Sequence, residues 1–167
     1  MSNSRLDNRN DIRAGNQMQN KSLNQLVNDF KNNLDEVYNN YKRNDYTQMD
    51  KLIEDICTNG DPSINKFHEY LTMIRKIRDL KSRGNQEWKK EVYKVAIKLK
   101  YIAVKNTNLR NPQKAKYLPA AVAEFLVNKC DDKEILDTIQ FLEIFFAKNL
   151  ISAKMQKGQM FSDEESH

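Results

Sequence analysis

Apolar residues recur at intervals of three and four along most of this chain, which is the spacing of one face of an α-helix. The clearest run follows Ser22 and consists of Leu23, Leu26, Val27, Phe30, Leu34, Val37, Tyr38 and Tyr41. Only 4 Gly and 3 Pro occur among 167 residues, whereas β-proteins use these residues heavily in their many turns. The sequence therefore predicts an all-α fold, a compact bundle of about six helices with a disordered N-terminal arm.

Helix boundaries follow from capping residues. Ser22 is a plausible N-cap with Gln25 in the capping-box position, and Asp61-Pro62 and Asn111-Pro112 combine a cap with a proline suited to the first helical turn. Pro119 is expected to restart or kink the chain. We expect helices at about 22–41, 47–57, 61–83, 86–106 and 120–129, and a last one after the acidic segment 131–134.

The helix expected at about 86–106 has two apolar faces. One contains Trp88, Val92 and Leu99, and the other contains Tyr93, Ile97 and Val104. A helix that is apolar on two sides touches more than one neighbour. We therefore expect this helix to lie at the centre of the bundle.

Composition also suggests the domain organisation. Residues 1–20 have almost no apolar side chains, which predicts a disordered polar arm. Residues 21–158 form the single helical domain, and 159–167 a flexible acidic tail. No apolar run is long enough to span a membrane, and the polar N-terminus does not have the pattern of a secretory signal.

Few residues suit catalysis. The chain has two histidines and two cysteines without zinc-site spacing, and its isolated glycines cannot form a phosphate-binding loop. Cys57 is interpreted as a small buried hydrophobe and His68 as a partly exposed helix residue, with both cysteines free, as in a cytosolic (cytoplasmic) protein. We expect no catalytic residues, no metal site, no cofactor and no enzyme activity.

Positive charge is concentrated in the middle of the chain. Residues 66–118 carry 15 Lys and Arg against 4 Asp and Glu, a net charge of +11, whereas the segments before and after carry −2 and −4. Such an uneven distribution favours a polyanionic partner more strongly than the overall charge of +5 does.

Within that block, Lys90, Lys94, Lys98 and Lys105 lie within about 80° of one another on a helix. Arg75 and Arg78 lie on the preceding helix and Arg110 in the following segment. If the two helices pack antiparallel, we expect their basic faces to merge into one wall that holds a phosphate backbone. Tyr93, Tyr101 and Tyr117 are candidates for stacking on bases, although packing is the commoner role of tyrosines at helical spacing.

Three stretches resemble the small helical subunit of type III-A CRISPR–Cas (Csm) effector complexes. The stretch 70–77, YLTMIRKI, is similar to that family's Leu-Thr-Thr-Ser-x-Ile-Arg segment, and 97–101, IKLKY, is similar to its alternating apolar and basic segment. Residues 124–126 and 141–147, EFL and FLEIFFA, resemble its closing helix. The likeness covers about residues 68–158.

This resemblance implies an all-α subunit without an active site. Several copies stack along the backbone of the complex beside the crRNA and the target RNA, in contact with other effector subunits. Arg75, Lys98 and Lys100 match the family's basic positions, and only the resemblance supports Lys100. The resulting prediction is a non-catalytic subunit that binds RNA through phosphates, at Arg75, Arg78, Lys90, Lys94, Lys98, Lys100, Lys105 and Arg110.

Two other functions fit the same residues. In a protein–protein scaffold or adaptor without a nucleic-acid role, the lysines serve solubility and the helix with Phe141 to Phe146 is the docking surface. A peripheral protein on an anionic membrane is less favoured, because no exposed Trp, Phe or Leu face is expected beside the basic stripe. No membrane partner is therefore expected.

Overall fold

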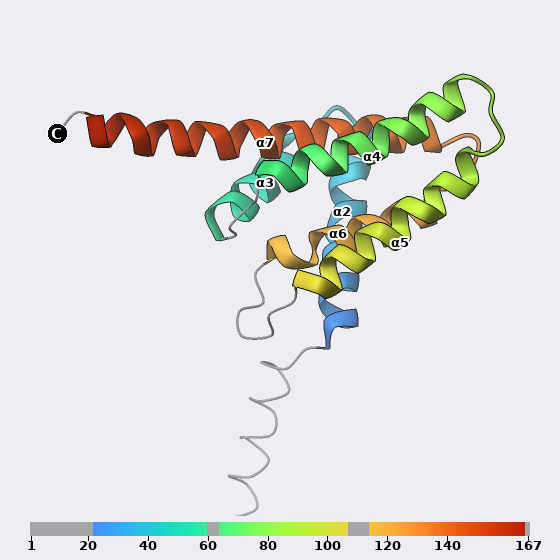
Figure 1. Ribbon diagram of the computed structural model, residues 1–167, viewed down its shortest axis with the longest axis horizontal. Helices are drawn as coiled ribbons and strands as arrows, with labels where there is room; N and C mark the ends of the chain where they lie inside the picture. Colours follow the sequence, from blue (N-terminus) through green and yellow to red (C-terminus); the bar gives the residue numbers. More distant parts are fainter. Residues whose placement is uncertain (1–21, 60–63, 107–113, 166–167) are drawn as a thin grey trace, which may run out of the picture.

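The computed structural model describes residues 22–59, 64–106 and 114–165. These residues form six helices, labelled α2 to α7, and none of them lies in a strand (Figure 1). The predicted all-α bundle is therefore confirmed. The helices span Leu23–Lys42 (α2), Thr47–Asn59 (α3), Ile64–Ser82 (α4), Trp88–Asn106 (α5), Lys114–Asn128 (α6) and Ile135–Glu165 (α7).

Two helix starts show how side chains set the boundaries. The Ser22 hydroxyl accepts a hydrogen bond from the Gln25 backbone N–H at 3.3 Å, so the predicted N-cap of α2 is confirmed. Before α7, one carboxylate oxygen of Asp131 accepts bonds from the backbone N–H groups of Lys133 and Glu134, at 3.0 and 2.7 Å. From the sequence, the acidic segment 131–134 is predicted to favour the start of a helix. These two bonds show how Asp131 contributes to that start.

The six helices pack in a definite order. α5 packs against α6 and α4, α4 packs against α7, α2 against α6, and α3 mainly against α7 (Figure 1). Aromatic rings from three helices meet at the centre of the core. Tyr38 of α2 contacts Phe125 of α6 edge-on, with 5.5 Å between ring centroids, and Phe141 of α7 at 5.2 Å.

The expectation that α5 lies at the centre is wrong, because α6 occupies that place. Ala121 and Ala123 are both fully buried although they point to opposite sides of α6. α6 packs against both α5 and α2, and small buried side chains on a helix leave room for close neighbours. Pro119 lies inside α6 instead of restarting the chain. It is the sixth residue of the helix and lies beyond the four N-terminal N–H groups that have no intrahelical partner, so α6 lacks one backbone hydrogen bond at this position.

The C-terminal end also differs from the sequence prediction. α7 continues as a helix to Glu165, through most of the segment expected to be a flexible tail, and in Figure 1 it extends past the other helices. Gly158 does not end it, since one glycine inside a helix costs only about 1 kcal/mol.

The predicted arm 1–20 and the predicted caps at 61–62 and 111–112 lie outside the described residues. Within residues 22–59, 64–106 and 114–165, none of the helices combines the length and the apolar composition needed to span a bilayer.

Candidate nucleic-acid interface

One face of α5 is open to solvent along the whole helix. The opposite face is buried in the core through Trp88, Val92, Val95, Leu99 and Ala103. Because a helix turns by about 100° per residue, the residues between these anchors point outward. We call this outward side of Trp88–Asn106 the α5 face.

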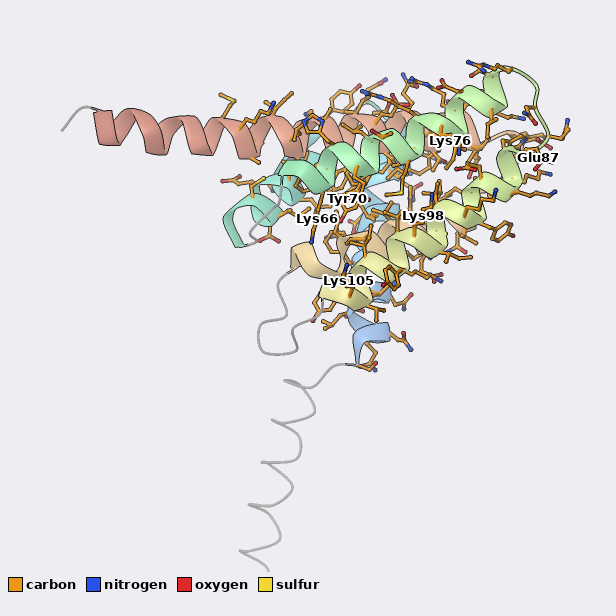
Figure 2. All side chains as sticks on the ribbon, in the orientation of Figure 1. Lys66, Tyr70, Lys76, Glu87, Lys98 and Lys105 are labelled. Carbon is orange, nitrogen blue, oxygen red and sulfur yellow. The ribbon has the colours of Figure 1, made fainter. Side chains whose placement is uncertain are left out.

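The four lysines of the predicted stripe all lie on the α5 face. Lys90, Lys94, Lys98 and Lys105 are exposed, and Figure 2 labels Lys98 and Lys105 along the helix. Lys90 lies 3.5 Å from the exposed Glu87 carboxylate. The other three make no ion pair with a carboxylate in the described part of the chain. Their charges are therefore available to an anionic ligand.

Apolar side chains share the α5 face with these lysines. Tyr93, Ile97, Tyr101 and Val104 are 57%, 68%, 65% and 62% exposed. Tyr93, Ile97 and Val104 are the second apolar face predicted from the sequence, and the expectation that it packs against a neighbouring helix is wrong. The tyrosine rings are accessible to a ligand, whereas the third candidate ring, Tyr117 of α6, is half-buried and burial raises the pKa of its phenol.

The cations of α4 have a different environment, because several form ion pairs with other elements. Lys76 lies 3.4 Å from Glu91 of α5, whose side chain is buried. Lys81 donates a hydrogen bond to Asp132 at 3.0 Å in the turn before α7, and this bond, together with the charge of Lys81, lowers the pKa of that carboxyl. Figure 2 shows Lys76 on the α4 side of the α4–α5 pair. The expected continuous basic wall across α4 and α5 is therefore interrupted by these pairs.

Arg78, a predicted RNA contact, also has a structural partner. Its guanidinium donates to the Glu143 carboxylate of α7 at 2.6 Å. Glu143 is largely buried, and its other oxygen has no hydrogen-bond partner among the described residues. The positive charge of Arg78 thus offsets the free-energy cost of burying the Glu143 carboxylate, which would otherwise have no cation beside it.

The remaining predicted contacts are separated by the fold. Arg75 is exposed and makes no ion pair with a described residue, but it lies about 60° around α4 from Arg78 and about 100° from Lys76. It is thus turned toward the α7 side, away from α5. Lys100 is half-exposed and lies 2.5 Å from Glu124 of α6. Arg110 lies outside the described residues.

The docking surface expected for a scaffold protein is inside the molecule. Phe141, Phe145 and Phe146 of α7 are fully buried, so the expectation that this stretch is a docking surface is wrong. The α5 face carries the larger apolar exposure instead. The sequence contained a signal for it, because α5 is the helix whose apolar residues fall on two faces.

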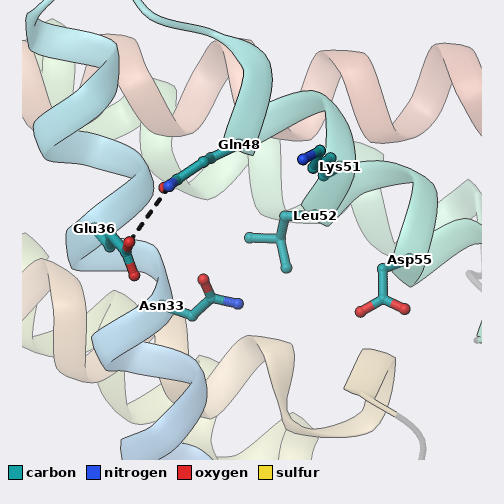
Figure 3. Close-up of a pocket in the computed structure, with 6 residues that line it drawn as sticks. All are labelled: Asn33, Glu36, Gln48, Lys51, Leu52 and Asp55. Atoms are coloured by element: carbon teal, nitrogen blue, oxygen red, sulfur yellow. Dashed lines mark hydrogen bonds between the residues drawn. The ribbon is translucent and has the colours of Figure 1, made fainter.

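Other polar groups of the described residues are dispersed. Cys57 and Cys130 are free thiols, as predicted, and burial raises the pKa of both. His68 is exposed on α4. A shallow groove between α2 and α3 is lined by Asn33, Glu36, Gln48, Lys51, Leu52 and Asp55 (Figure 3). There Gln48 donates to Glu36 at 3.3 Å. The described side chains contain no group of three or more His, Cys, Asp or Glu placed to hold a metal ion.

Comparison with known proteins gives no relative for this chain. No family model matches the sequence, and no curated protein or solved structure is significantly similar to it. The resemblance to the CRISPR small subunit therefore stays a prediction.

Proposed function

We propose that this chain is a non-catalytic RNA-binding subunit of a multisubunit ribonucleoprotein, resembling the small subunit of the type III CRISPR interference complex. It binds the RNA backbone beside the paired crRNA and target RNA, next to other effector subunits and further copies of itself, in the cytoplasm. The single observation that carries the proposal is the α5 face, on which Lys94, Lys98 and Lys105 are exposed and unpaired with described carboxylates.

The chemistry of that face suits a phosphate backbone. Lysines at four-residue spacing follow one another about 6 Å apart along the helix axis. Each lysine that neutralises a phosphate releases condensed counterions, and this release supplies most of the affinity of non-specific binding. The α4 cations contribute less, because Lys76, Arg78 and Lys81 already have carboxylate partners.

A salt titration tests this proposal. We expect the full chain to bind a labelled RNA with an affinity that falls with salt, at a slope of log K against log salt of about −3 for four lysines on a single strand. Lys94→Glu/Lys98→Glu halves that slope and lowers affinity by about 25-fold at roughly 0.1 M salt. Fluorescence anisotropy measures both quantities.

Matched charge reversals give the control. Lys51 of α3 and Lys154 of α7 are also exposed, so Lys51→Glu/Lys154→Glu changes the net charge equally at other places. We expect this control to bind RNA nearly as well as the wild type. Equal losses in the two double variants would show that net charge alone is responsible and would refute a binding face on α5. Copurification of crRNA with the tagged subunit from its native host tests membership of the complex.

A protein–protein scaffold without a nucleic-acid role is the second candidate. The specific observation in its favour is the exposure of Tyr93, Ile97, Tyr101 and Val104, since an apolar strip on a surface helix is typical of a docking face. This function predicts no RNA binding at low salt and no effect of Lys94→Glu/Lys98→Glu on RNA affinity.

A further inference from the structure

The α5 face combines two features that the phosphate-binding proposal does not need together. Lysines occupy both of its edges. Lys94, Lys98 and Lys105 lie on the side next to α4, where Glu91 contacts Lys76, and Lys100 lies on the side next to α6, where it contacts Glu124. Between these edges run Tyr93, Ile97, Tyr101 and Val104, each more than half exposed. A phosphate backbone gives this central strip nothing to contact.

The faces of nucleic-acid bases are the apolar counterpart that fits such a strip. In a duplex these faces are stacked inside the helix, and a protein meets phosphates, sugars and base edges. A single strand exposes its base faces, which stack on aromatic side chains while basic residues hold the backbone. Two accessible tyrosine rings between a row of three lysines and Lys100 therefore match an unpaired strand better than a duplex.

The dimensions of the face set the length of the ligand. Tyr93 and Tyr101 are eight residues apart, which is about 12 Å along the helix axis and about 80° around it. Ile97 lies midway between the two rings. From Lys90 to Lys105 the face extends about 23 Å, the length of about seven nucleotides at the rise of a stacked strand.

We propose that the α5 face binds single-stranded RNA, with unpaired bases stacked on Tyr93 and Tyr101 and the backbone held by the flanking lysines. This inference rests on the proposed RNA-binding function and names its substrate class. It gives the subunit a preference for unpaired nucleotides over paired ones. The apolar strip contains no Trp, Phe or Leu, the residues that anchor helices in a lipid surface, and its charge complements a polyanion.

Variants of both tyrosines test the proposal. The full chain is titrated with a labelled 12-nucleotide oligouridine and with a 12-base-pair RNA duplex at the same salt concentration. We expect the wild type to bind the single strand more tightly. Tyr93→Leu/Tyr101→Leu keeps the apolar bulk but removes the π-faces. We expect this variant to lose affinity for the single strand by about fivefold or more per ring, since stacking is worth ~1–3 kcal/mol per base.

Tyr93→Phe/Tyr101→Phe is the matched control, because it keeps both rings, and we expect single-strand affinity within about threefold of wild type. Tyr46, exposed in the turn between α2 and α3, supplies a second control in Tyr46→Leu. Duplex binding should be the same in all these variants. Helical circular dichroism confirms that the fold is retained.

Other outcomes would contradict either the stacking on the tyrosines or RNA binding as a whole. If the Leu variant binds the single strand as the wild type does, while Lys94→Glu/Lys98→Glu loses it, the lysine-based function stands and the stacking inference fails. If neither RNA binds the wild type at low salt, the proposed function fails and the inference fails with it. Binding only to phosphatidylserine-containing vesicles, retained in the Leu variant, would assign the face to a membrane instead.

Discussion

Tyr70 shows how a single buried side chain sets the behaviour of this protein at high pH. Its side chain lies in the core, where it packs against Phe67 and Phe146. Burial raises the pKa of its phenol well above the ordinary value of 10, and the charge of Glu69 adds to the effect. The folded state therefore keeps its proton in a pH range where the unfolded chain has lost it.

This difference predicts a loss of stability in alkali. Above about pH 10 the unfolded state binds one proton fewer than the folded state, so the free energy of unfolding falls by about 1.4 kcal/mol per pH unit. Tyr70→Phe removes the titrating group, and we expect its stability relative to wild type to rise by about 1 kcal/mol between pH 10 and 11, because the unfolded-state phenol is half titrated at pH 10. Urea unfolding at pH 8, 10 and 11 measures it. Parallel decline of the two proteins would contradict the assignment, and Tyr46→Phe is the surface control.

Arg78 shows at the scale of elements how α4 is joined to α7. Its ion pair with Glu143 compensates a largely buried carboxylate. Arg78→Ala leaves that carboxylate without a cation, and we expect the free energy of unfolding to fall by about 1–2 kcal/mol, below the cost of breaking a fully buried pair because Arg78 is partly exposed. Chemical denaturation of Arg78→Ala, Glu143→Gln and the double variant measures the coupling.

The same variant separates a structural role from RNA binding. Arg78→Ala should bind RNA as the wild type does, since its guanidinium is held by Glu143. An RNA affinity reduced as strongly as in Lys94→Glu/Lys98→Glu, with stability unchanged, would restore Arg78 to the set of RNA contacts.

The packing of α6 leads to a second prediction about elements. Ala121 is fully buried in the helix that lies between α5 and α2. Ala121→Leu adds volume where no space is available, and we expect a loss of about 1–3 kcal/mol of stability. Ala147 of α7 is only half-buried, so Ala147→Leu should cost clearly less. Thermal unfolding of the two variants compares them, and an equal effect would argue against close packing at α6.

The helices themselves could be predicted from sequence, whereas their neighbours could not. The three-and-four spacing of Leu34, Val37 and Tyr38 reports that one face of α2 is buried, but it carries no information on which helix covers that face. The two apolar faces of α5 were interpreted as two buried faces for this reason. The neighbouring residues in the sequence do not show whether an apolar strip packs on another helix or remains exposed to solvent, as Tyr93 and Ile97 do.

At the scale of the whole molecule, the positive block of residues 66–118 is divided into two populations. Arg78 and Lys81 of α4 have carboxylate partners in distant segments, Glu143 and Asp132, which sequence spacing cannot reveal, whereas Arg75 has no such partner among the described residues. Three lysines of α5 are left without such partners and point to solvent. The sequence located the block and the α5 stripe, and only the fold shows which charges remain available.

Leaving like charges unpaired on one face should reduce the stability of the folded molecule. Lys90, Lys94 and Lys98 follow one another at four-residue spacing, and each adjacent like-charged pair costs ~0.2–0.5 kcal/mol. Lys94→Gln removes two such pairs, so we expect it to raise the free energy of unfolding by about 0.5–1 kcal/mol at low salt and by much less at 0.5 M salt, where the repulsion is screened. Urea denaturation at both salt concentrations measures the gain, and RNA titration of the same variant should show weaker binding. If the variant loses both stability and RNA binding, Lys94 supports the fold. If it gains stability and loses RNA binding, Lys94 serves a polyanionic ligand at the expense of stability, which is the result we expect.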